Sequence, residues 1–287
     1  MKNYRAQLVG VFGDPVDENP TGVMEEAAFA VKGLNYRYLT LLVHPRDLQS
    51  AMQSLRALNF RGINLTIPHK VAAAAYMDTL SEAAAIIGAI NVVVNQGGRL
   101  WGDNTDGKGF LASLADAEIQ VADKTLTVLG AGGASRAICV ECALAGAKTI
   151  FVANRNEDRG RALVSLLKEK TGIQAEYLPW IESLPIPAET DILINATSVG
   201  LAPNTDQCPD IEYQGITNAM TACDVVFNDP DSLFLQAAAG RGARIVNGLG
   251  MLARQGTLNF TMWTGEEAPL PVMEEALRRE FGLPNRI

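Results

Sequence analysis

The chain has 287 residues and a net charge of −8, from 24 Lys and Arg against 32 Asp and Glu. This acidic balance argues against a nucleic-acid or anionic-membrane binder, and 48% apolar residues suffice for the cores of about two domains. No apolar stretch reaches the ~18 residues of a membrane span, and the first ten residues lack the apolar region of a signal peptide. We therefore expect a cytoplasmic protein that binds neither nucleic acid nor membrane.

Metal and thiol chemistry find little support in the sequence. The chain has only two histidines and four irregularly spaced cysteines, which is typical of a reduced protein without a metal site. Cys139 and Cys142 lie one helical turn apart, and we expect them to be small buried hydrophobes. We therefore expect that the protein binds no metal ion.

Short β-rich runs alternate with helical patterns along the first half of the chain, which is typical of βαβ units and parallel sheets. A hairpin is indicated by the Gln-Gly-Gly turn at residues 96–98. The predicted strands are 7–12, 36–43, 62–66, 89–95 and 99–101, and the predicted helices are 22–32 and 46–58.

The second half restarts this pattern after a bridging helix at 106–114. Its predicted strands are 125–129, 148–153, 191–195, 222–227 and 244–247, and its further helices are 136–145, 157–170, 231–239, 251–263 and 271–281. We predict an α/β protein with two lobes. Residues 1–105 with the C-terminal helices of about 256–287 form an N-terminal αβ substrate domain, and residues 106–255 form a Rossmann-type dinucleotide-binding domain.

A glycine-rich loop follows the strand at 125–129 and opens the next helix. In this context glycines permit a tight turn, and the helix N-terminus attracts a pyrophosphate. Ser135 breaks the strict G-x-G-x-x-G pattern, so a ligand-free turn is the alternative. The predicted dinucleotide contacts are Gly130, Ala131, Gly132, Gly133 and Ala134.

The end of the following strand normally separates the two nicotinamide cofactors. Acids there accept bonds from the adenosine ribose of NAD, whereas a basic residue accommodates the 2′-phosphate of NADP. The acids after this strand favour NAD and Arg155 favours NADP, so we expect NAD, with NADP as the alternative. The candidate residues are Asn154, Arg155, Asn156, Glu157 and Arg159.

Polar residues interrupt the first half where packing would prefer apolar side chains. They lie at 64–70 (NLTIPHK), 88–91 (GAIN) and 102–107 (GDNTDG). With the glycine loop, 195–200 (NATSVG) and 248–252 (GLGML), these segments make the chain resemble shikimate dehydrogenases over almost its whole length. The resemblance implies a reversible, NAD(P)-linked oxidation of a ring hydroxyl in a polyol carboxylate, from shikimate to 3-dehydroshikimate in the type reaction.

The resemblance also implies the catalytic groups. Lys70 is the implied acid/base, and Asp106 lies beside it. A free lysine ammonium has a pKa near ~10.4, which burial lowers and a neighbouring carboxylate raises. The sequence leaves open which effect prevails. The alternative is a Lys–Asp salt bridge that ties two loops together.

Further residues are implied on both ligands. The ring hydroxyls would be bound by Asn64, Thr66, Asn91 and Gln255. The nicotinamide end of the cofactor would be lined by Thr197, Ser198, Val199, Gly248 and Met251.

The chain departs from the family pattern where the substrate carboxylate would bind. Asn19 and Thr21 stand in place of two serines, Glu25-Glu26 in place of a His-Asn pair, and Phe227 in place of a tyrosine. We therefore expect weak shikimate affinity, or quinate or an amino analogue as substrate. A folate-linked dehydrogenase and a non-catalytic nucleotide sensor are the competing hypotheses, and we expect a monomer or a homodimer.

Overall fold

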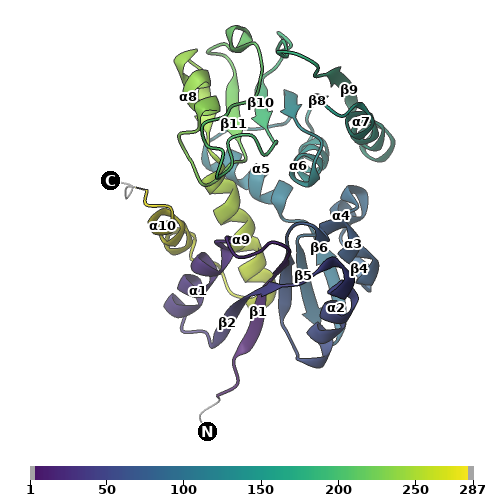
Figure 1. The fold of residues 1–287 in the computed structure, drawn as a ribbon, viewed down its shortest axis with the longest axis vertical. Helices are drawn as coiled ribbons and strands as arrows, with labels where there is room; N and C mark the ends of the chain where they lie inside the picture. Colours follow the sequence, from purple (N-terminus) through teal and green to yellow (C-terminus); the bar gives the residue numbers. More distant parts are fainter. Residues whose placement is uncertain (1–3, 284–287) are drawn as a thin grey trace. The chain divides into compact units, whose positions relative to one another are not determined.

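The structure, a computed structural model, describes residues 4–283 (Figure 1). The chain forms two compact units, Met1–Thr105 with Ala253–Ile287, and Asp106–Leu252. Residues 253–255, which the sequence placed in the dinucleotide domain, belong to the first unit.

The first unit contains a mixed sheet of six strands. The strand order is β2-β1-β3-β5-β6-β4. β1 is parallel to β2 and β3, whereas β5 is antiparallel to both β3 and β6. The predicted hairpin turn joins β5 to β6 through Gly97 and Gly98, both at positive φ. The strands are β1 Gln7–Gly13, β2 Tyr36–Leu42, β3 Gly62–Leu65, β4 Thr79–Leu80, β5 Val92–Gln96 and β6 Arg99–Asp103.

Eight helical elements accompany this sheet within the described residues. The sequence predicted the long ones and missed α3, η2 and α4, which are too short to show a helical period. Ser81 Oγ caps α4 by accepting the Ala84 amide at 3.1 Å, and Gly88 ends it in the left-handed conformation. The helices are α1 Thr21–Val31, η1 Pro45–Asp47, α2 Leu48–Ala57, α3 His69–Ala72, η2 Ala73–Tyr76, α4 Glu82–Ile87, α9 Gly248–Thr264 and α10 Leu270–Glu280, with η1 leading directly into α2.

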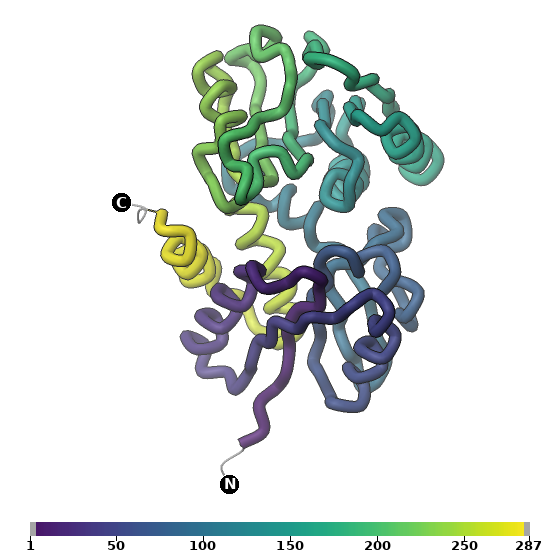
Figure 2. The backbone as a smooth tube through the Cα atoms, viewed as in Figure 1, coloured from purple at the N-terminus to yellow at the C-terminus, as the bar shows by residue number. Residues whose placement is uncertain are grey.

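The C-terminal helices pack onto N-terminal elements. Figure 2 shows α10 beside α1. The Phe29 ring of α1 stacks on Phe260 of α9 with centroids 5.5 Å apart, and Trp263 Nε1 of α9 donates to the Val93 carbonyl at 3.1 Å. A Cβ on Gly256 would lie 2.3 Å from Met24 Cε, so a larger residue there would displace the end of the Met24 side chain between α1 and α9. This packing anchors α9 on the first sheet.

The second unit is built on a six-stranded parallel sheet in the order β12-β11-β10-β7-β8-β9. When β7 is counted as strand 1 and the sheet is read from β9 to β12, the order is 3-2-1-4-5-6. This is the arrangement of dinucleotide-binding sheets, and its switch point lies between β7 and β10. The edge strand β9 was not predicted. The strands are β7 Thr125–Leu129, β8 Thr149–Asn154, β9 Gln174–Pro179, β10 Ile192–Asn195, β11 Thr221–Asp224 and β12 Arg244–Val246.

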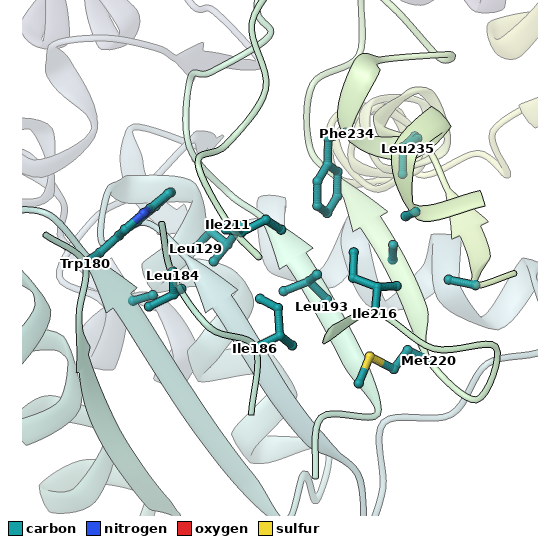
Figure 3. Close-up of a cluster of buried hydrophobic side chains, with 14 residues drawn as sticks. Leu129, Trp180, Leu184, Ile186, Leu193, Ile211, Ile216, Met220, Phe234 and Leu235 are labelled. Carbon is teal, nitrogen blue, oxygen red and sulfur yellow. The ribbon is translucent and has the colours of Figure 1, made fainter. Parts of the chain in front are cut away.

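Helices and one large apolar cluster complete the second unit. Figure 3 shows this cluster, with Trp180 at one end and Phe234 and Leu235 at the other, around Leu193 of the central strand β10. Within residues 4–283, no helix combines the length and apolar character that a membrane crossing requires. The helices are α5 Asp106–Asp116, α6 Gly133–Leu144, α7 Glu157–Thr171, η3 Tyr213–Gly215 and α8 Leu233–Gly240.

Candidate active site

A chain of buried polar side chains runs through the first unit. Tyr38 Oη of β2 donates to Asn64 Oδ1 of β3 at 2.9 Å. Asn64 Nδ2 in turn donates to the Asn91 carbonyl at 3.0 Å. Both asparagines are buried, so their remaining hydrogen-bonding capacity is directed to neighbouring groups and not to bulk water. Asn64 and Asn91, predicted from different segments, thus belong to one network.

The network continues from Asn91 into α9. Asn91 Oδ1 accepts the Thr105 amide at 2.8 Å, and Thr105 Oγ1 lies 2.9 Å from Asn259 Oδ1. Asn259 Nδ2 then donates to Gln255 Oε1 at 3.0 Å. Amide and hydroxyl groups that supply both donors and acceptors suit a ligand with several hydroxyls. Three of the four predicted hydroxyl-binding residues therefore belong to one connected network of buried polar side chains in the first unit.

Sequence reasoning missed Tyr38, Thr105 and Asn259. Asn259 carried a usable signal, because an Asn four residues after Gln255 falls on the same helix face in an otherwise apolar pattern. Tyr38 carried none, since a strand tyrosine in a half-apolar run is ordinary core material. The fourth predicted hydroxyl ligand, Thr66, donates its backbone N–H to the Phe12 carbonyl at 3.0 Å.

Lys70 lies on the short helix α3, directly after β3 and the Thr66 segment. The Lys70 carbonyl accepts the Ile90 amide at 2.8 Å, so its backbone is held beside the residue that precedes Asn91. The neighbouring His69 is buried and its Nε2 lies 2.7 Å from the Val43 carbonyl. His69 is thus engaged in holding α3 against the β2 end.

Asp106 is the first residue of α5 and is buried. It follows Thr105 directly, and the Thr105 amide is bound by Asn91. A Cβ on the next residue, Gly107, would lie 2.4 Å from the Ala137 carbonyl, so α5 approaches α6 too closely for a larger residue. The backbone of Asp106 is therefore held by the hydrogen bond at Thr105 before it and by the close packing at Gly107 after it.

The predicted carboxylate clamp is organised differently from a pair of serine donors. Asn19 Oδ1 accepts the backbone N–H of Thr21, the first residue of α1, at 3.1 Å. An acceptor oxygen thereby occupies the helix N-terminus, where an anion would otherwise bind. Burial and the nearby Glu25 carboxyl raise the pKa of Tyr38, and a hydrogen bond with the Thr21 side chain opposes this shift.

The second unit carries the glycine loop with a geometry suited to a phosphate. Gly130 has φ +105°, and a Cβ there would lie 2.9 Å from the Ala196 carbonyl, so this position requires glycine. Ser135 Oγ donates back to the Gly130 carbonyl at 2.6 Å and closes the turn. At Gly132 and Gly133 a Cβ would meet nothing within 4 Å, which leaves open space above the first turn of α6.

A further observation supports a dinucleotide at this loop. Arg136 Nε, in the first turn of α6, is buried and has no hydrogen-bond partner among residues 4–283. Together with the open space at Gly132 and Gly133, this cation suits a pyrophosphate at the helix N-terminus. The residues present therefore fit the nicotinamide dinucleotide that the sequence predicts.

The adenosine end of the predicted site lies after β8. Asn156 Oδ1 caps α7 by accepting the Arg159 amide at 2.9 Å, and Asn154 Nδ2 donates to the Asn156 carbonyl at 2.7 Å. The Arg155 guanidinium lies 5.3 Å from the Trp180 ring centroid. These hydrogen bonds hold the segment 154–156 in a defined conformation, with Arg155 at its centre.

The predicted nicotinamide-end loop 197–199 is held by a buried polar cluster. Asn195 Oδ1 accepts from Thr197 Oγ1 at 2.7 Å, and Asn195 Nδ2 donates to Asp224 Oδ1 at 3.0 Å. Burial raises the pKa of Asp224 to about 6, against the hydrogen bonds from Ser232, Val226 and Asn195 that lower it. Sequence reasoning did not identify Asp224 as part of this cluster.

The remaining predicted cofactor residues have distinct positions. Ser198 is exposed and Val199 is partly buried, and the Val199 amide donates to Thr197 Oγ1 at 3.1 Å. Gly248 begins α9, where a Cβ would lie 2.4 Å from the Val226 carbonyl. Met251, one turn later on α9, is partly buried.

Three family models match successive parts of the chain. The shikimate dehydrogenase substrate binding domain covers residues 11–93, shikimate / quinate 5-dehydrogenase covers 113–203, and the shikimate 5'-dehydrogenase C-terminal domain covers 248–278. The first match lies in the first unit, the second lies in the second unit, and the third covers the end of the second unit and the C-terminal helices of the first. The matches contain the glycine loop, Asn195, and the network residues Tyr38, Asn64, Asn91, Gln255 and Asn259, whereas Thr105 and Asp224 lie outside them.

Individual relatives match over nearly the full length. A shikimate dehydrogenase (NADP(+)) of Desulforamulus reducens is 39% identical, with 97% of each chain covered. The ligand-free 5-ketofructose reductase of Gluconobacter sp. strain CHM43 is 40% identical with a TM-score of 0.92, covering 97% of this chain and 100% of that one. Shikimate 5-dehydrogenase from Listeria monocytogenes, solved with shikimate and NAD, is 32% identical with a TM-score of 0.89, covering 96% and 97%. The chain belongs to the shikimate dehydrogenase family.

Proposed function

We propose that the protein is an NAD(P)-linked oxidoreductase that interconverts a secondary hydroxyl of a polyhydroxylated substrate and its ketone. The observation that carries this proposal is the connected network from Tyr38 through Asn64, Asn91 and Thr105 to Asn259. Each buried amide is costly unless it has hydrogen-bond partners, so several of them gathered in one network indicate a binding role beyond packing. Shikimate and 3-dehydroshikimate are the first candidate pair, because the relatives from Desulforamulus and Listeria are named for shikimate.

In the proposed reaction the proton and the hydride leave the same carbinol group. A bound nicotinamide supplies the hydride acceptor. Lys70 takes the hydroxyl proton on oxidation and returns it on reduction, and Asp106 orients the lysine ammonium. His69 is the other basic side chain of the segment, but its Nε2 is engaged with the Val43 carbonyl. Lys70 is therefore the proton-transfer group in this proposal.

For the cofactor, the geometry favours NADP over the NAD that the sequence favoured. Glu157 is paired with Arg161 at 2.6 Å, so its charge opposes a 2′-phosphate less than expected. Arg155 lies over Trp180 with its guanidinium at the end of β8, where a 2′-phosphate is recognised. The Desulforamulus relative is named for NADP(+), while the Listeria enzyme was solved with NAD.

A second candidate substrate is an uncharged ketose. Its support is the Asn19 oxygen at the start of α1, which accepts the Thr21 amide, so this backbone donor is no longer available to a carboxylate. The 40% identical 5-ketofructose reductase acts, by its name, on a keto-sugar without a carboxylate. Reduction of such a ketone uses the same hydride and proton transfers in the reverse direction.

The direct experiment follows reduced nicotinamide absorbance with both dinucleotides. Shikimate and quinate are tested in the oxidative direction, and 3-dehydroshikimate and 5-ketofructose in the reductive direction. The proposal expects turnover with at least one of these pairs and a higher kcat/KM with NADP(H) than with NAD(H). Absence of turnover with all four compounds and both dinucleotides contradicts it.

A further inference from the structure

Glu25 is an acidic residue of the first unit whose surroundings are unusual for a carboxyl group. Its side chain is fully buried in α1, and neither carboxyl oxygen has a hydrogen-bond partner among residues 4–283. Burial, followed by the nearby Glu26 carboxylate, raises the pKa of Glu25 well above its ordinary value. A buried carboxyl without a partner is costly and calls for a reason beyond packing.

Glu25 lies close to the substrate network. It stands four residues after Thr21 on α1, so both side chains lie on one helix face, with ~5–6 Å between their Cβ atoms. The Glu25 carboxyl is near enough to Tyr38 to raise the pKa of that phenol, and Tyr38 is hydrogen-bonded to Asn64 at 2.9 Å. Glu25 is thus one side chain removed from the proposed hydroxyl-binding residues.

No basic group balances this carboxyl in the described part of the chain. The adjacent Glu26 adds a second acid and is occupied, since it accepts the Tyr38 amide. Asn19, just before the helix, presents its oxygen to the Thr21 amide, and the neutral donors there are Asn19 Nδ2 and the Thr21 hydroxyl. The end of α1 where the family resemblance places the substrate carboxylate therefore combines two acids with neutral amide and hydroxyl groups.

We propose that Glu25 is a specificity-determining residue that disfavours carboxylate substrates and so selects an uncharged polyol or ketose. The inference rests on the proposed polyol oxidoreductase function. At a pH above the raised pKa of Glu25, a carboxylate bound at Asn19 and Thr21 would either face an ionised Glu25 or require Glu25 to take up a proton. An uncharged group at the same place incurs neither cost. Two like charges about 6 Å apart, the spacing of side chains one helical turn apart, repel at an effective dielectric of ~20 by an energy that corresponds to ~10- to 100-fold in affinity.

The test uses two ligands that differ in charge, shikimate and its carboxamide. Their dissociation constants are measured by titration calorimetry at mildly alkaline pH, with the full chain saturated by NADP+. The wild-type protein is expected to bind the carboxamide at least ~10-fold more tightly. Glu25→Gln is expected to tighten shikimate binding at least ~10-fold and to change carboxamide binding less than ~3-fold.

Glu26→Gln is the matched control. It removes the same charge from the next position of α1, and its amide oxygen still accepts the Tyr38 N–H. It is expected to change the ratio of the two constants much less than Glu25→Gln does, because the Glu26 carboxylate is already engaged with the Tyr38 amide. Equal effects of Glu25→Gln on both ligands, or an equal effect of Glu26→Gln, overturn the proposal.

The wild-type comparison alone also decides, should Glu25→Gln fold poorly. Tighter binding of shikimate than of its carboxamide overturns the role of Glu25. Turnover is measured in parallel with the same ligands, and 5-ketofructose in the reductive direction. Absence of all turnover contradicts the proposed function, whereas the ratio of dissociation constants tests Glu25 independently of catalysis.

Discussion

Asn91 Oδ1 accepts the backbone amide of Thr105 at 2.8 Å, joining the start of β5 to the segment that follows β6. Because Asp106 is the next residue, this bond fixes the backbone that carries the proposed partner of Lys70. The Asn91 backbone is itself tied, through its amide, to the Asp103 carbonyl at 3.0 Å. One asparagine thus connects the proposed hydroxyl-binding network with the backbone of the proposed catalytic carboxylate.

Replacing Asn91 by Ala is expected to damage activity beyond its effect on stability. The buried Thr105 amide loses its acceptor, which costs about 1–3 kcal/mol in the free energy of unfolding. Loss of the bond also loosens Asp106, so kcat/KM for the polyol substrate should fall by at least ~10-fold in protein that remains folded. Urea denaturation and steady-state kinetics measure the two effects.

Asn95→Ala is the matched control on the same strand. Asn95 is also buried, donates to the Leu55 carbonyl at 3.1 Å and accepts the Gly98 amide at 2.7 Å, away from the network. It should lose comparable stability and keep its kcat/KM. Equal losses of activity in both variants would show that Asn91 acts only through stability.

Two glycines of the same loop should respond differently to alanine. Gly132 has φ −84°, and a Cβ there meets nothing within 4 Å, so Gly132→Ala should fold normally and fill the space proposed for the pyrophosphate. We expect its Kd for NADP+ to rise at least ~10-fold, since the backbone can no longer approach the phosphate. Gly130→Ala should instead lose about 1–3 kcal/mol of stability, because its φ is +105° and the Ala196 carbonyl is close. Thermal unfolding with and without NADP+ measures both, and unaltered binding by folded Gly132→Ala argues against the loop as the phosphate site.

Arg155 is expected to determine the choice between NADP and NAD. Arg155→Ala should raise KM for NADP at least ~10-fold and KM for NAD less than ~3-fold, because only NADP carries the 2′-phosphate. Arg241→Ala, in which an exposed arginine bound to the Gln214 carbonyl is lost, serves as the control. Parallel changes in both KM values would remove Arg155 from cofactor selection.

Asp224 should make stability depend on pH. Its pKa is raised from 3.8 to about 6 in the folded protein, so its contribution is complete below about pH 4 and is lost as pH rises through about 6. Relative to Asp224→Asn, the wild-type free energy of unfolding should fall by up to roughly 3 kcal/mol between pH 4 and pH 7. Urea unfolding of both proteins across this range gives the difference, and parallel pH profiles contradict the assignment.

Periodicity and turn chemistry predicted most of the fold. The alternation of short strands with long helices predicted the parallel sheet of the second unit, and glycines 97 and 98 predicted the hairpin of the first. The elements α3 and α4 were missed, because four to six residues do not complete enough turns to show a period. The predicted boundary at about residue 256 and the division between the two units at residues 252 and 253 both lie within α9, where no turn or composition change marks a boundary.

The sequence predicted which residues could form the candidate site, but not how they are connected. Asn64, Asn91 and Gln255 stood out as amides among apolar residues, but their connection through Tyr38, Thr105 and Asn259 depends on contacts between segments far apart in the chain. Likewise, Glu25 followed from the sequence as a departure from the family pattern. Its complete burial without a partner required the packing of α1, which periodicity does not determine.

The central claim is that Lys70 transfers the proton of the oxidised hydroxyl. The measurement is kcat/KM of Lys70→Met with the best wild-type substrate, together with its Kd for NADP+, using exposed Lys148→Met as control. The account predicts a ~10²- to 10⁴-fold loss of turnover with NADP+ binding retained. Turnover by Lys70→Met equal to that of the control would contradict it.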